Sequence, residues 1–154
     1  MLRIILAALH LLALGIGVSS VLARGTALRE SPTVASFRRV FRADLLWGIA
    51  AVIWITTGLW RVFGETEKTV GFYFSNHLFL TKMGLLVVVL VLESWPAMTL
   101  GRWRRAIRRG DSPETVFSES VARRIATISH VEATLVVIMV FLAVSMARGF
   151  GARG

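Results

Sequence analysis

Four long apolar segments constrain what this chain can fold into more than any other feature of its sequence. They cover residues 2–22, 43–63, 80–100 and about 128–147. Each is close to the roughly 20 residues that an α-helix needs to cross the hydrocarbon core of a bilayer. Their apolar residues run all round the helical wheel, as contact with lipid requires. The sequence therefore predicts an all-α fold, an integral membrane four-helix bundle.

The composition agrees with a protein embedded in lipid. Hydrophobic residues make up 55% of the 154 residues, and the four segments with their connections use nearly the whole chain. We therefore expect residues 1–154 to form a single four-span transmembrane domain. Cysteine is absent, which excludes disulfides and thiolate metal sites.

The first segment has an alternative interpretation as a secretory signal peptide. Arg3, the apolar stretch and the Val21-Leu22-Ala23 sequence match the three parts of such a signal. The segment is long for the apolar part of a signal, however, and it contains His10. We expect it to be a membrane span.

The positive charge of the chain lies between the apolar segments. A net charge of +9 in a soluble protein would suggest nucleic acid as the partner, but here the basic residues flank membrane spans and favour the lipid bilayer instead. Twelve of the eighteen Lys and Arg residues, Arg24 among them, fall in the first and third connections. Because such residues stay in the cytoplasm, we expect a multi-pass protein of the bacterial inner (cytoplasmic) membrane with both termini periplasmic.

Each of these two basic connections contains a Ser-Pro pair, Ser31-Pro32 and Ser112-Pro113. Serine caps helices, and proline is favoured as the first helical residue, so both pairs predict a helical lead-in continuous with the following span. The match reflects either an internal duplication or chance.

Ionisable side chains within the spans are the candidate functional residues, because each costs at least about 2.5 kcal/mol in a membrane without a partner. They are His10, Arg61, Lys82, Glu93, His130 and Glu132, with His77 just outside the third segment.

His10 shares its helical face with the small residues Ala7, Ala13 and Gly17. Such a face allows either close approach of another helix or a flat ligand against the imidazole. Both interpretations remain open.

The third segment carries Lys82 and Glu93 about three turns apart, on one side of the helix. Lys82 either reaches the outer boundary of the membrane or faces the bundle. Glu93 must face inward, where it either pairs with a cation or stays protonated, so it is a candidate for proton handling.

In the fourth segment, His130 and Glu132 lie on nearly opposite faces, so one of them at best faces the bundle. Glu93 and Glu132 lie at similar depths, and they can face each other. His130 and His10 differ in depth by on the order of 10 Å, so the sequence does not indicate a haem held by two histidines.

The second segment places Trp47, Ala51, Trp54, Gly58 and Arg61 on one stripe. This stripe is either a packing seam or an aromatic wall beside a ligand, with Arg61 holding an acidic group such as a propionate.

Residues 7–15, 43–51, 57–61 and 81–84 resemble a family of predicted four-helix bacterial inner-membrane proteins. More distantly, the first-segment histidine and the lysine that opens the third segment resemble the copper-resistance-D-like superfamily, which includes the membrane protoporphyrinogen oxidase. That likeness implies binding of b-type haem, with His10 as a haem ligand and Lys82 as an essential lysine.

These observations predict a small membrane protein that binds haem b or a porphyrin for redox or haem-related work. His10 would bind the haem iron, and Lys82, Arg61 and Glu93 would shape the pocket. The alternatives are a noncatalytic accessory subunit of a larger membrane complex, or a homodimer, and copper handling through scattered methionines. Whether the protein is an enzyme is left open.

Overall fold

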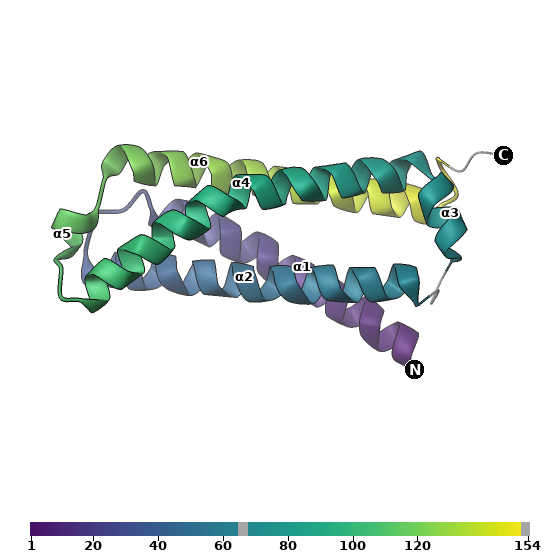
Figure 1. Ribbon diagram of the computed structural model, residues 1–154, viewed down its shortest axis with the longest axis horizontal. Coiled ribbons are helices and arrows are strands. Elements are labelled where there is room, and N and C mark those ends of the chain that lie inside the picture. The colour runs from purple at the N-terminus through teal and green to yellow at the C-terminus, as the bar shows by residue number, and fades with distance from the viewer. Residues whose placement is uncertain (65–67, 152–154) are drawn as a thin grey trace.

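The structure of the protein, a computed structural model, describes residues 1–64 and 68–151 (Figure 1). Within this part of the chain all regular structure is helical. The six helices are α1 (Leu2–Ala27), α2 (Val34–Phe63), α3 (Val70–Ser75), α4 (His77–Arg108), α5 (Pro113–Val116) and α6 (Glu119–Ala147). Helices α1, α2, α4 and α6 are long and apolar enough to cross a membrane. Each contains one predicted span, which confirms the all-α membrane bundle.

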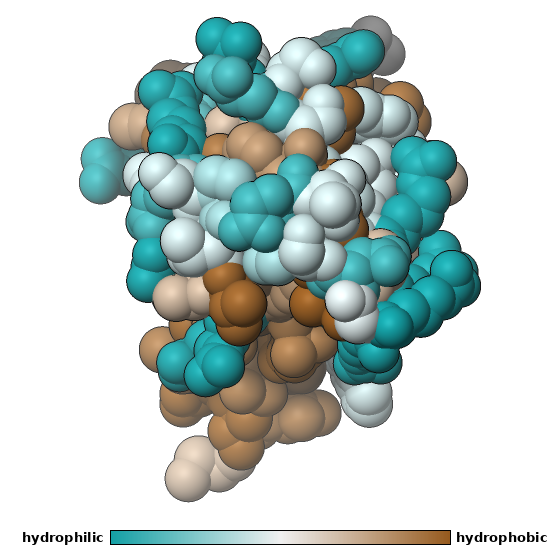
Figure 2. All heavy atoms as spheres, turned by 90° about the vertical axis from the view of Figure 1, so that its left-hand side faces the viewer, coloured by the Kyte–Doolittle hydropathy of each residue, from teal (hydrophilic) through white to brown (hydrophobic). Residues whose placement is uncertain are grey.

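The long helices extend beyond the predicted spans, mainly toward one end of the bundle. Helix α5 lies at that end, whereas α3 and the beginning of α1 lie at the opposite end (Figure 1). Figure 2 looks at the α5 end and shows hydrophilic residues over much of this face. The exposed basic residues at this end include Arg29, Arg38, Arg39, Arg102, Arg105, Arg108 and Arg109. The polar ends of the helices therefore project past the apolar layer, as expected for spans that continue into basic loops.

The start of α2 differs from the predicted Ser31-Pro32 cap. Thr33 is the capping residue: its hydroxyl accepts a hydrogen bond from the backbone N–H of Ser36 at 3.1 Å, and the Ser36 hydroxyl accepts one from the backbone N–H of Thr33 at 2.9 Å. The predicted cap is wrong because this reciprocal pairing satisfies two backbone donors at once.

The second Ser-Pro pair does begin a helix, since Ser112 precedes α5 and Pro113 is its first residue. That helix ends at Val116, however, and α6 begins only at Glu119. Both spans therefore have the predicted helical lead-in, over residues 34–42 of α2 and 119–127 of α6, but neither lead-in begins at its Ser-Pro pair.

Helix α1 packs mainly against α2 and α6, and α4 packs mainly against α6, whereas α2 and α4 touch little. On α1, Ala13 and Gly17 are buried, and a Cβ added at Gly17 would lie 3.2 Å from the Trp47 ring and 3.5 Å from Cβ of Ala50. This part of the small-residue face therefore serves the close approach of α1 and α2.

The outer surface of the bundle is apolar. Large hydrophobic side chains are strongly exposed on all four long helices, among them Leu12, Val52, Val91 and Phe141, with exposed fractions of 63%, 63%, 66% and 70%. A soluble protein would leave few such residues in contact with water. Lipid is the solvent that this surface fits.

Replacement of Gly17 by leucine should destabilise the protein by about 1–3 kcal/mol, because the added side chain pushes α1 away from Trp47. The matched control is Gly15→Leu, since Gly15 is exposed and a Cβ there meets nothing within 4 Å. Thermal unfolding in detergent measures the stability of both variants. Equal midpoints for the two variants would contradict the close packing of α1 on α2.

Candidate functional site

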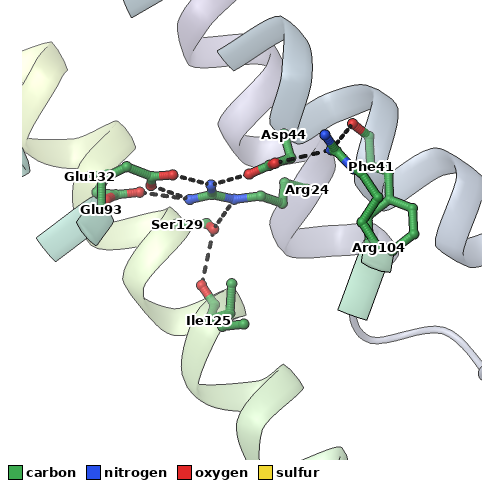
Figure 3. A network of polar contacts seen from close by, with 8 residues as sticks. All are labelled: Arg24, Phe41, Asp44, Glu93, Arg104, Ile125, Ser129 and Glu132. Carbon is green, nitrogen blue, oxygen red and sulfur yellow. Dashed lines mark hydrogen bonds and ion pairs between the residues drawn. The ribbon is translucent and has the colours of Figure 1, made fainter. Parts of the chain in front are cut away.

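The bundle contains two polar regions. We call the first the Arg24 cluster; it consists of Arg24, Asp44, Glu93, Arg104, Ser129 and Glu132 (Figure 3). The second, the His10 cavity, is an internal space lined by His10 and residues of α2, α3, α4 and α6.

The guanidinium of Arg24 is fully buried and makes five hydrogen bonds. Its Nη1 donates to Oδ1 of Asp44 at 3.1 Å and to Oε1 of Glu93 at 2.7 Å. Its Nη2 donates to Oε2 of Glu93 at 2.8 Å and to Oε2 of Glu132 at 2.9 Å. Its Nε donates to the Ser129 hydroxyl at 3.0 Å. All five N–H groups of the side chain are therefore used, with a two-pronged contact to Glu93.

The partners of Arg24 come from the three other long helices: Asp44 from α2, Glu93 from α4, and Ser129 and Glu132 from α6. Arg104 of α4 adds a second cation, since its Nη2 lies 3.3 Å from Oδ2 of Asp44 and 3.0 Å from the Phe41 carbonyl oxygen. One side chain of α1 thus joins all four spans.

The assignment of Arg24 to a basic loop is wrong. It follows the predicted span by two residues, yet α1 continues to Ala27 and buries the side chain. The signal that reveals it is spacing: His10, Gly17 and Arg24 are seven residues apart and share one face of α1. Three acidic residues in the other spans also required a buried cation.

The prediction that Glu93 faces inward is confirmed. Glu93 faces inward and pairs with a cation, and Glu132 shares that cation. Glu132 is fully buried, whereas His130 on the other face of α6 is only partly buried, with Nδ1 2.6 Å from the Ala126 carbonyl oxygen.

The His10 cavity lies toward the α3 end and has a volume of about 410 Å³. A further space of about 330 Å³, lined largely by α2 and α4, shares His10, Trp54 and Lys82 with it. Of the four predicted pocket residues, the structure brings together His10, Arg61 and Lys82 around this cavity. Glu93 does not line it and lies in the Arg24 cluster instead. His77 is exposed at the start of α4.

His10 is held by its neighbours on α2. Nδ1 lies 3.0 Å from the Thr57 hydroxyl oxygen, and that hydroxyl lies 2.7 Å from the Ile53 carbonyl oxygen. Since the single hydroxyl hydrogen is donated to Ile53, the Thr57 oxygen accepts a hydrogen from Nδ1, and Nε2 then carries the lone pair of the ring. Gly58 leaves room for this arrangement, because a Cβ there would lie 3.1 Å from Cε1 of His10.

The lining of the His10 cavity favours an anionic, partly apolar ligand. Besides His10 it contains Arg61, Lys68 and Lys82, and none of the described residues that line it is acidic. The indole Nε1–H of Trp54 is buried and has no hydrogen-bond partner within the described part of the chain. A ligand with carboxylate or carbonyl oxygens would carry charge opposite to these side chains and could accept from the Trp54 indole.

A site for a bare metal ion finds less support. Across residues 1–64 and 68–151, no three His, Asp or Glu side chains are arranged to hold one. Copper handling through methionines stays a prediction.

The sequence of the chain matches the model of a family of predicted membrane proteins, DUF2214, over residues 2–151. The chain belongs to this family. No curated protein and no solved structure matches it. The more distant resemblance to the copper-resistance-D-like superfamily stays a prediction.

Replacement of Arg24 by glutamine should destabilise the protein by about 3–5 kcal/mol, because buried carboxylates lose their shared cation. The control is Arg39→Gln, which removes an exposed ion pair with Glu30 and should cost no more than about 1 kcal/mol. Thermal unfolding in one detergent compares the two. If both variants unfold together, the Arg24 cluster does not hold the bundle.

Proposed function

We propose that the protein binds haem b or a related porphyrin in the His10 cavity. The observation that carries the proposal is a single space that joins a deeply placed histidine to three other basic side chains and an apolar wall. Its volume falls within the roughly 300–1,000 Å³ that is typical of small-molecule sites.

The basic residues fit the carboxylates of such a ligand. Arg61 and Lys82 reach the cavity from α2 and α4. A cation surrounded by apolar groups interacts strongly with a carboxylate, because little water screens the pair. Arg61 and Lys82 would therefore hold propionate groups, and Trp54 would form part of the flat wall.

His10 fits the role of an axial ligand. Its hydrogen bond to Thr57 fixes the ring and favours the tautomer whose Nε2 can bind a metal. Haem, when bound, would supply one-electron redox chemistry. The residues of this chain would bind and orient it and limit the access of water.

Entry from the lipid phase is consistent with the packing. Helices α2 and α4 touch little, and residues from both line the second space. Leu59 of α2 and Leu80 of α4 also line it and are 47% and 46% exposed on the outer surface. An amphipathic ligand dissolved in the membrane would therefore pass between these helices.

Titration of purified protein in detergent with haem b, followed by absorption spectroscopy, tests the proposal. We expect a spectrum of histidine-ligated haem for the wild type and its loss in His10→Ala, because the ligating nitrogen is removed. The control is His77→Ala, since His77 is exposed and does not line the cavity.

A second titration with iron-free protoporphyrin separates metal ligation from recognition of the carboxylates. His10→Ala should change the affinity for iron-free protoporphyrin little. Arg61→Gln and Lys82→Gln should lower the affinity for haem b and for iron-free protoporphyrin by roughly tenfold or more, because each loses a charged hydrogen bond of about 1.5–3 kcal/mol. Failure of the wild type to bind either compound would contradict the proposal and favour the accessory-subunit alternative.

We also propose that the protein resides in a bacterial inner membrane with both termini in the periplasm. Even when Arg24 is not counted as a loop residue, the α5 end has a clear excess of basic residues over the opposite end. Alkaline phosphatase fused to the C-terminus should be active and green fluorescent protein at the same position dark. The reverse pattern would show the opposite orientation.

A further inference from the structure

The Arg24 cluster contains more acidic groups than basic ones. Asp44, Glu93 and Glu132 contribute three carboxyl groups, and Arg24 and Arg104 contribute two cations. With all three carboxyl groups ionised, the cluster would hold one negative charge that no cation in it balances. A buried uncompensated charge is costly in a protein interior and more so within a membrane.

The position of one atom indicates where the missing positive charge belongs. Oε1 of Glu132 is buried and receives no hydrogen bond within the described residues. Arg24 cannot supply one, because its five N–H groups are already used. The other oxygen of Glu132 does accept from Arg24, so one side of the carboxyl group is satisfied and the other is not.

We propose that Glu93 and Glu132 share one exchangeable proton, so that the Arg24 cluster is a proton-binding site inside the membrane bundle. The carboxyl groups of these residues lie side by side in front of Arg24 (Figure 3). A proton on Oε1 of Glu132 turns this oxygen into a donor and makes the cluster neutral. No bond other than O–H forms or breaks when the proton is taken up or released.

A proton fits this site better than a metal ion. Among the described residues no three acidic or histidine side chains are arranged to hold a metal ion, and the carboxyl groups of the cluster are arranged around the Arg24 guanidinium instead. The carboxyl pair faces Arg24 from α1, and Asp44 from α2 and Ser129 from α6 contact the same guanidinium. Arg104 from α4 lies beyond Asp44, to which it donates a hydrogen bond.

The two carboxyl groups differ in accessibility. The side chain of Glu93 is 19% exposed, whereas that of Glu132 is fully buried. Arg24 lies in the last turn of α1, and the beginning of α1 is at the end of the bundle opposite α5. Exchange would therefore pass through Glu93, with Glu132 as the protected position. This inference does not depend on a ligand in the His10 cavity.

Infrared spectroscopy of the purified protein in detergent at neutral pH tests the proposal. The wild type should show the carbonyl stretch of a protonated carboxyl group, and the band should shift when H2O is replaced by D2O. Glu132→Gln removes the protonated group, and Glu93→Gln makes the cluster neutral without a proton, so both variants should lose the band. The control is Glu119→Gln, whose side chain is 74% exposed and which should keep it.

Asp44→Asn provides a further variant if either glutamine variant fails to fold, as judged by size-exclusion chromatography. It also removes one negative charge from the cluster and should likewise abolish the band. Absence of the band in the wild type would overturn the proposal. A band that survives Glu93→Gln would overturn the sharing of the proton, and a band insensitive to D2O would overturn its exchange.

Discussion

The hydrogen bonds of Arg24 are the interaction on which the arrangement of the four spans depends. A buried guanidinium is tolerated only when its charge and its five N–H groups are all matched, and here the partners come from α2, α4 and α6. Rotation or sliding of any of these helices would leave a charge or a donor unmatched in an apolar surrounding. The cost of that mismatch selects one register of the helices, a specificity that lipid-facing apolar side chains alone do not provide.

Helix α1 organises both polar regions because one of its faces carries His10, Gly17 and Arg24 at intervals of seven residues. Arg24 joins the helices at the α5 end, Gly17 allows α2 to approach closely, and His10 reaches the cavity near the α3 end. At 1.5 Å per residue, His10 and Arg24 lie about 21 Å apart along the helix. The two regions are therefore separate sites on one element, and the proton proposed for the first is independent of the ligand proposed for the second.

Much of the fold could be predicted from the sequence, because the length and composition of a span follow directly from the bilayer. The helix ends could not, since Thr33 and Ser36 form a local pairing that competes with the Ser-Pro signal. For the candidate site, an inward-facing Glu93 followed from the cost of burying charge, whereas spacing along the fourth segment left open whether His130 or Glu132 faces the bundle. Arg24 was missed because the apolar run ends before the helix does. The separation of Glu93 from Lys82 was available from the sequence, because eleven residues at 1.5 Å per residue place them about 16 Å apart along one helix.

The placement of the two regions at opposite ends of the bundle gives a physical reason for the cavity. Charged hydrogen bonds hold the four helices together near the α5 end, so the packing there does not rely on apolar contact alone. Helices α2 and α4, by contrast, touch little. The mutual repulsion of Arg61 and Lys82 adds to their separation. A ligand with negative charge would remove this repulsion and draw α2 and α4 together, so binding in the His10 cavity should stabilise the bundle at the end where its own side chains do so least.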